Sequence, residues 1–141
     1  MIKLPSDVQF LEEVRLLILR PHGVLDESSL NKIVDVIGEL EAMSKEPFNR
    51  FWDATGYHDV KLNFRVAMNV SVYRRLAYSD RPSIKSAILA TDRRIIQYAR
   101  LLALMTQGSP IKLHVFRDRQ EAADWLGVPI GLLGPRPNGS S

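Results

Sequence analysis

Short apolar runs alternate along this chain with longer segments whose apolar residues recur at helical spacing. The runs predict β-strands, and apolar positions three or four residues apart predict helices that bury one face. The predicted strands span residues 14–20, 23–25, 49–54, 83–90 and 111–116. The predicted helices lie between Asp26 and Pro47, within residues 60–79, between Asp92 and Gly108, and between Asp118 and Gly127. Because strands and helices alternate from residue 23 onward, we expect that part of the sheet to be parallel.

The first two predicted strands are too close in the sequence for a crossover, which needs about a dozen residues or more. Residues 14–20 end at Pro21, and residues 23–25 follow at once. We therefore predict an antiparallel hairpin that turns through residues 20–23.

Aspartates precede three of the predicted helices, where a carboxylate can accept hydrogen bonds from the free N–H groups of the first turn. These residues are Asp26, Asp92 and Asp118. For the helix within residues 60–79, Asp59 and Asn63 are alternative capping residues. Local sequence therefore predicts where most helices begin.

The predicted strands differ in how fully their two faces are covered. Residues 83–90 are almost continuously apolar toward their end, which is typical of a buried parallel strand. Residues 111–116 alternate, so one face of that strand is expected to be less covered. The apolar residues 128–133 either fold back on the domain or form a homodimer contact, and residues 134–141 resemble a flexible tail.

Composition places the chain among ordinary globular domains. It has 141 residues, 45% of them hydrophobic and 25% charged, so we expect a single domain over residues 1–133. It has no cysteine, which excludes disulfides, thiolate metal ligands and cysteine nucleophiles. No apolar run is long enough for a membrane span or a signal peptide, and we therefore expect a cytoplasmic protein with no integral membrane segment.

The charge is unevenly distributed. Residues 61–100 hold nine basic and two acidic side chains, whereas the rest of the chain is slightly acidic. Four of these residues combine arginine and tyrosine and form a candidate partner surface: Arg74, Arg75, Tyr78 and Arg81. The alternative is that they form solvated helix faces, with the arginines offsetting the negative end of a helix dipole. No motif indicates specific nucleic-acid binding.

The element order resembles that of the STAS domains, and within them the SpoIIAA-like, or STAS/SEC14-like, family of small bacterial proteins. The stretches that carry the likeness are Arg20-Pro-His-Gly-Val-Leu-Asp26, residues 74–91, Ala103-Leu-Met-Thr106 and residues 116–127. The resemblance implies an α/β fold with a four- to five-stranded, mostly parallel sheet, an N-terminal antiparallel hairpin and about four helices. It implies a regulatory module that binds a protein partner, with no catalytic activity.

Regulatory STAS domains switch through phosphorylation of a serine at the start of the helix after the third strand. The corresponding residues here, 60–64, contain no serine or threonine, and the nearest hydroxyl is that of Thr55. The phosphorylation switch is therefore not carried over to this chain.

Ligands of open parallel sheets tend to bind beyond the carboxyl ends of the strands. Polar residues follow two predicted strands there and form a candidate ligand or anion site: Asp53, Thr55, His58, Thr91, Asp92 and Arg93. Helix N–H groups and Arg93 could hold a phosphate or carboxylate. The alternative is that Thr91 and Asp92 only cap the helix, because an aspartate competes with an anion for the same groups.

His58 lies near Asp53 and Asp59 in the sequence, and a histidine–carboxylate pair could serve as a general base. No nucleophile motif accompanies it, the three histidines lack metal-ligand spacing, and no phosphate-binding loop occurs. We therefore predict no catalytic residues, no cofactor and no metal. The sequence favours a non-enzymatic interaction module, with a SEC14-like carrier of a small apolar or anionic ligand and a hydrolase-like enzyme using His58 as alternatives.

Overall fold

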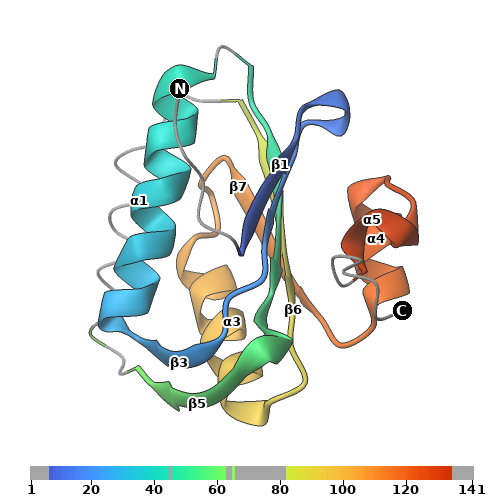
Figure 1. The fold of residues 1–141 in the computed structure, drawn as a ribbon. Coiled ribbons are helices and arrows are strands. Elements are labelled where there is room, and N and C mark those ends of the chain that lie inside the picture. The colour runs from blue at the N-terminus through green and yellow to red at the C-terminus, as the bar shows by residue number, and fades with distance from the viewer. Residues whose placement is uncertain (1–6, 45, 63–64, 66–81, 135–141) are drawn as a thin grey trace.

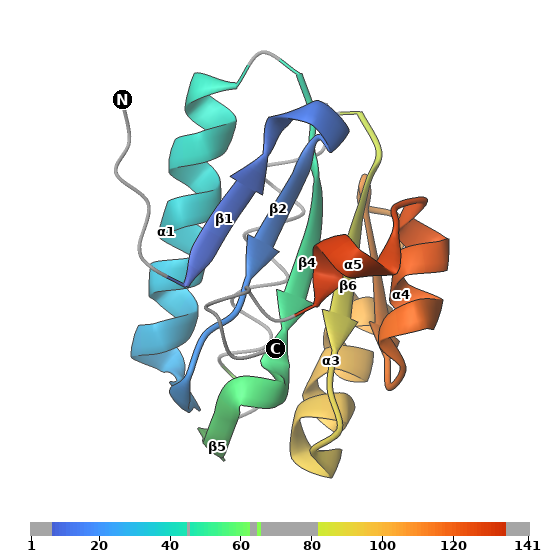
Figure 2. The same ribbon diagram turned by 45° about the vertical axis from the view of Figure 1, so that its right-hand side comes forward.

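The computed structural model describes residues 7–44, 46–62, 65 and 82–134. Among these residues the main sheet has five strands, in the spatial order β1-β2-β4-β6-β7 (Figure 2). Their bounds are β1 Val8–Leu11, β2 Leu16–Leu19, β4 Asn49–Asp53, β6 Ile84–Leu89 and β7 Ile111–Phe116. β1 runs antiparallel to β2, and every other neighbouring pair is parallel. The predicted α/β class and mostly parallel sheet are confirmed.

Helices cover both faces of this sheet (Figure 1). α1 Glu27–Met43 and α3 Arg93–Met105 lie on one face, and α4 Arg119–Leu126 and α5 Ile130–Leu133 lie on the other. The strand order advances in one direction from β2 to β7. Right-handed crossovers therefore place α1 and α3 on the same face, and among the described residues the chain that follows β7 supplies the helices of the opposite one.

The central strands are buried on both faces, which explains their continuous apolar runs. In β2, Leu17 and Leu19 pack toward α1 and α3, whereas Leu16 and Ile18 pack toward α4. Phe51 of β4 belongs to the α4 side and is completely buried. In β7 the faces alternate as predicted: Leu113 and Val115 pack against the α3 side, and Phe116 packs against α4.

The predicted pairing of residues 14–20 with residues 23–25 is wrong. The N-terminal antiparallel hairpin exists, but β1 and β2 form it through the 3-10 turn Glu12–Val14 and Arg15, whose φ is +49°. β3 Gly23–Asp26 instead pairs in parallel with β5 Tyr57–Lys61, in a second, two-stranded sheet. The prediction failed because Val14 and Arg15 belong to the turn and because β3 finds its partner far away in the sequence.

The segment after β4, for which no strand was predicted, forms regular structure. A short 3-10 helix, Ala54–Gly56, leads directly into β5, in which Tyr57 is buried and His58 is exposed. Asp59 lies within this strand, so it does not cap a helix as one alternative had it. Most of the predicted helix within residues 60–79, and its alternative cap Asn63, lie outside the described residues.

The predicted helix caps are confirmed. Asp26 accepts from the backbone N–H of Ser29, and the Ser29 hydroxyl accepts from that of Asp26, which completes a capping box on α1. Asp92 accepts from the N–H of Arg94, and Asp118 from that of Gln120. Gly108 and Gly127 both have positive φ, as expected of residues that end helices in the left-handed region.

The apolar segment after α4 folds back on the sheet. Leu133 of α5 is fully buried beside Leu16 and Phe51. Arg20, which follows β2, donates to the carbonyl oxygen of Gly134 at 2.6 Å and so fixes the chain beyond α5. The first of the two alternatives for residues 128–133 is confirmed, and a homodimer contact stays a prediction. Residues 135–141 lie outside the described part of the chain.

One ion pair lies inside the main core. Arg50 of β4 is only 2% exposed, and its Nη2 lies 2.5 Å from Oε2 of Glu41 on α1. The guanidinium also lies over the ring of Phe48, 5.6 Å from its centroid. The pair joins α1 to the middle of the sheet, where a single unpaired charge would be costly.

None of the helices in the described part of the chain combines the length and apolar character that a membrane crossing needs.

Candidate functional site

The polar residues at the carboxyl end of β4 are already engaged with one another. Asp53, the last residue of β4, accepts through Oδ1 from the backbone N–H and the hydroxyl of Thr55. Its Oδ2 lies 3.0 Å from Nη2 of Arg119 in the first turn of α4. Asp53 is buried, so its carboxylate holds the turn after β4 against α4 and is not presented to solvent.

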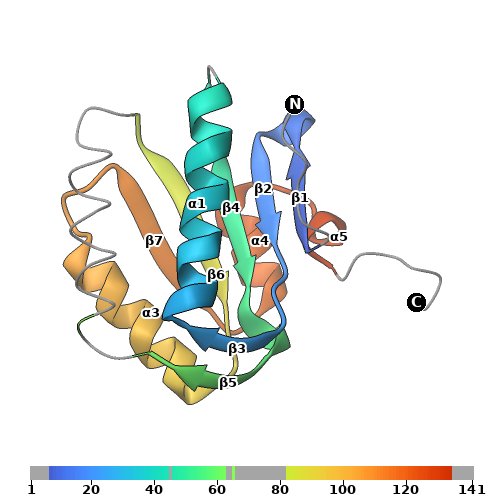
Figure 3. The same ribbon diagram turned by 60° about the vertical axis from the view of Figure 1, so that its left-hand side comes forward.

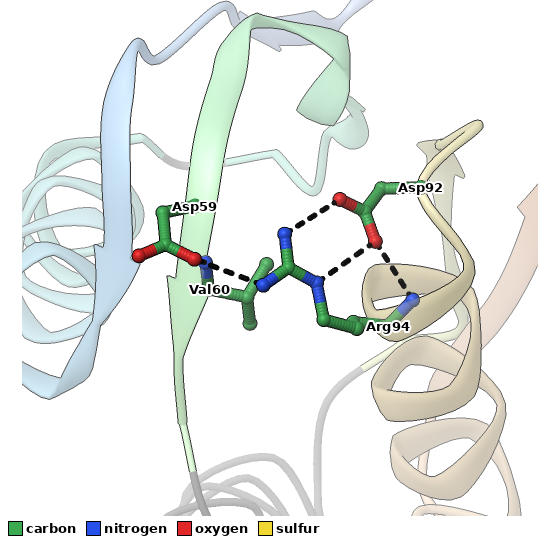
Figure 4. A network of polar contacts seen from close by, with 4 residues as sticks. All are labelled: Asp59, Val60, Asp92 and Arg94. Atoms are coloured by element: carbon green, nitrogen blue, oxygen red, sulfur yellow. Dashed lines mark hydrogen bonds and ion pairs between the residues drawn. The ribbon is translucent and has the colours of Figure 1, made fainter.

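A second network joins the start of α3 to β5 (Figure 4). Arg94 of α3 lies between two carboxylates: Nη2 is 3.0 Å from Oδ2 of Asp92, and Nη1 is 2.9 Å from Oδ1 of Asp59. Asp59 also accepts from the N–H of Val60 at 2.8 Å. The guanidinium therefore bridges the N-terminal cap of α3 and the two-stranded sheet of β3 and β5.

This network lowers the pKa of both carboxyl groups. For Asp92, hydrogen bonds from the Arg94 side chain and backbone are the main causes. For Asp59, the backbone N–H of Val60 contributes most and the Arg94 side chain follows. A carboxyl whose pKa is lower in the folded state stabilises the fold above its unfolded pKa, and this contribution is lost as the pH falls through the folded value.

Replacing Arg94 with glutamine is expected to raise the pKa of both carboxyl groups toward their ordinary value, with the larger rise at Asp92. The reason is that the Arg94 side chain is the largest cause of the lowered pKa at Asp92 but only the second largest at Asp59, and both carboxylates keep their backbone hydrogen bonds. Carbon-detected NMR titration of the two carboxyl groups measures the change. Arg93→Gln is the matched control and should leave both titrations unchanged; equal rises in the two variants would contradict the assignment to Arg94.

Both aspartates among the six predicted site residues are engaged in contacts within the fold. The carboxylates of Asp53 and Asp92 are engaged in the contacts described above. Thr91 and Arg93 are exposed at the start of α3. The strand order has no point at which it reverses, which is where ligands of open sheets bind. β3 and β5 lie beyond the carboxyl ends of the parallel strands (Figure 3). The anion site therefore stays a prediction that rests on Thr91 and Arg93.

His58 is exposed on β5 and makes no hydrogen bond or ion pair within the described residues. Its neighbour Asp59 is engaged with Arg94 and Val60, so the pair required by the hydrolase-like alternative is not formed there. The described residues also contain no group of three histidine, aspartate or glutamate side chains that could hold a metal ion. The candidate partner surface at Arg74, Arg75, Tyr78 and Arg81 lies outside the described residues.

An open groove, which no sequence pattern indicated, runs along the other side of α3. Its volume is about 670 Å³, and it lies between the C-terminal half of α3, the turn after it, and β7. Residues on α3 line one side and residues on β7 line the other: Arg100, Ala103, Leu104, Lys112, Leu113 and Val115. Leu104, near the C-terminal end of α3, is 62% exposed.

β7 forms one edge of the sheet, and within the described residues it pairs only with β6 (Figure 3). Ile84 donates to the carbonyl oxygen of Pro110 at 3.0 Å, and Ala90 donates to that of Phe116 at 2.9 Å. Parallel pairing alternates the direction of backbone groups along a strand. Lys112 and His114 therefore direct their backbone groups toward β6, whereas the N–H and C=O groups of Leu113 and Val115 face the open edge beside the groove.

Sequence reasoning missed Arg94, Arg119 and the groove. Arg94 stands two residues after a predicted cap, which is a local signal, but its second partner is 35 residues away in the chain. Arg119 lies 66 residues from Asp53. The groove forms because α3 packs against β7, which is an edge strand. The position of β7 at the edge follows from the strand order, which short-range sequence patterns do not reveal.

Comparison with solved structures identifies the architecture. An uncharacterised protein of the DUF3478 family from Shewanella loihica, described as having a SpoIIAA-like fold, superimposes with a TM-score of 0.53. The match covers 84% of this chain and 89% of that one, at 15% sequence identity. The fold is SpoIIAA-like. No protein-family model and no curated protein matches the sequence.

The SpoIIAA-like fold agrees with the resemblance noted in the sequence. At this identity the likeness concerns the fold alone, because one fold can host many unrelated functions. Function has therefore to be argued from the surfaces of this chain.

Proposed function

We propose that this chain is a non-enzymatic interaction module that engages a protein partner through the groove between α3 and β7. The observation that carries the proposal is the combination of an open groove, an exposed leucine and a strand edge that has no partner strand among the described residues. Exposed apolar side chains and free backbone groups at one place are typical of a surface that another chain covers.

The polar networks at the carboxyl end of the sheet support the same proposal. Asp53, Asp59 and Asp92 are each held by an arginine, and His58 has no carboxylate partner among the described residues. These contacts join secondary-structure elements to one another, which is a structural role. A regulatory role of the STAS type would fit this scaffold without requiring a reactive side chain.

A SEC14-like carrier is the second candidate, and the groove can be compared with the cavity that a carrier needs. A carrier of apolar ligands encloses most of its cargo in a cavity of roughly 300–1,000 Å³. The groove here has such a volume but is open to solvent along β7. An open groove favours a polypeptide, which can satisfy the backbone groups of the edge, over a small apolar molecule.

Site-specific photo-crosslinking tests the proposal. The photoreactive residue p-benzoylphenylalanine replaces Leu104 in the groove or, as a matched control, Met43 on α1, which is 59% exposed. After irradiation in extract of the source cells, the groove variant is expected to give discrete protein adducts that the control lacks. Adducts common to both variants, no adduct, or only a product of twice the chain mass would contradict a distinct protein partner at this groove.

A further inference from the structure

We propose that the partner presents an extended, acidic segment that adds to the edge of β7 as a sixth strand of the main sheet. This inference rests on the proposed interaction function and specifies the chemistry of its partner. Three features of the described residues carry it: the direction of the free backbone groups, the apolar side of the groove and the sign of its charges.

The backbone of β7 can hold a further strand. The N–H and C=O groups of Leu113 and Val115 face the open edge, as fixed by the hydrogen bonds from Ile84 and Ala90 to the other side of β7. Ile111, the preceding edge-facing residue, already donates its N–H to the hydroxyl of Ser109 at 3.0 Å. The edge therefore offers two complete residues for pairing and one further carbonyl, which suits a short segment in strand addition.

The groove beside the edge suits alternate side chains of such a segment. Successive side chains of a strand point to opposite faces, so every second one would lie toward α3. Ala103 and Leu104 line the groove there and offer apolar contact. A segment with apolar residues at every second position would thus bury Leu104, which is otherwise largely exposed.

The charge of the groove selects an acidic segment. Among the described residues that line it, Arg100 on α3 is basic and none is an aspartate or glutamate. Lys112 lies on the edge strand β7 with its side chain on the opposite face of the sheet, where it would flank an added strand. A lysine on an edge strand also disfavours pairing with another copy of the same strand, because two sets of these charges would be brought together. Charge complementarity therefore favours an acidic partner over a second copy of this chain.

Binding of a defined peptide tests the inference. The probe is a fluorescein-labelled decapeptide that alternates valine and glutamate, and binding to the full chain is followed by fluorescence anisotropy at low salt. Saturable binding is expected, weakened about tenfold or more when lysine replaces glutamate in the peptide. In the variant carrying Arg100→Glu and Lys112→Glu the preference should reverse, so that the lysine peptide binds better. Equal binding of both peptides to the unaltered chain would overturn the inference.

Two further measurements separate strand addition from a purely electrostatic contact. A glutamate peptide with the same charge but N-methylated at alternate residues should bind at least about tenfold more weakly, because it cannot pair with the edge. Hydrogen exchange monitored by NMR should show that the unmethylated peptide slows exchange at the amides of Leu113 and Val115. Undiminished binding of the methylated peptide, or unchanged exchange at both amides, would contradict strand addition.

These outcomes can be told apart from failure of the interaction function itself. If crosslinking at Leu104 captures a partner while the glutamate peptide leaves β7 unaffected, the groove binds protein but the proposed segment is wrong. If the peptide protects β7 as expected, the chemistry of the edge is established whether or not a cellular partner has been captured.

Discussion

Replacing Glu41 with glutamine is expected to lower the free energy of unfolding by about 1.5–3 kcal/mol, because the buried guanidinium of Arg50 loses the charged hydrogen-bond partner that it contacts at 2.5 Å. Arg50 is 2% exposed, and the side chain of Glu41 is 12% exposed. Water therefore cannot replace the lost partner at little cost. Urea unfolding followed by circular dichroism measures the change. The exposed variant Arg94→Gln is the comparison, and its midpoint should stay close to that of the unaltered chain.

The double variant Glu41→Leu with Arg50→Met separates two contributions to the free energy of unfolding: that of the intact ion pair and that of removing one of its partners. Removing both side chains takes both charged groups out of the core, and apolar side chains can pack in the space between α1 and β4. We expect the double variant to be more stable than Glu41→Gln. A double variant that is destabilised by the sum of the two single effects would show that the two residues act independently.

Replacing Gly56 with alanine is the second change with a large expected effect. A Cβ at this position would lie 2.5 Å from the carbonyl oxygen of Pro21 and 2.7 Å from Nδ1 of His22. The histidine ring can move, but the carbonyl belongs to the backbone that leads into β3. Overpacking of this kind costs about 1–3 kcal/mol, and we expect the loss to appear in urea unfolding.

Gly38 offers a matched control for this substitution. It lies within α1, and an added Cβ would meet nothing within 4 Å. Alanine at this position should stabilise the chain by about 0.5–1 kcal/mol, because glycine is unfavourable inside a helix. The two alanine substitutions should therefore shift the unfolding midpoint in opposite directions. An unchanged unfolding midpoint for Gly56→Ala would show that the backbone before β3 can shift without a loss of stability.

Local signals predicted the parts of the fold that are decided locally. The caps at Asp26, Asp92 and Asp118 were predictable because a carboxylate before an apolar helical pattern acts on its own next residues. The buried strands β2, β4 and β6 were predictable for a similar reason, since burial on both faces leaves a continuous apolar run. Their parallel arrangement followed from the alternation with helices.

The errors arose where pairing partners are distant. β3 follows β2 so closely that a hairpin was the natural prediction, yet its partner β5 begins at Tyr57, in a segment for which no strand was predicted. The contacts of the candidate site residues show the same division. Arg94 lies two residues after Asp92, so that contact could have been predicted locally, whereas Arg119 lies 66 residues after Asp53 and no short-range pattern indicates their contact.

The one-directional strand order also bears on how the chain is made. The face of the sheet formed by Leu16, Ile18 and Phe51 is covered by α4 and α5, which follow every strand in the sequence. A nascent chain that still holds residues 119–133 within the ribosome therefore exposes this face to the surrounding solution. Such surface invites aggregation and binding by chaperones until the last helices emerge and dock.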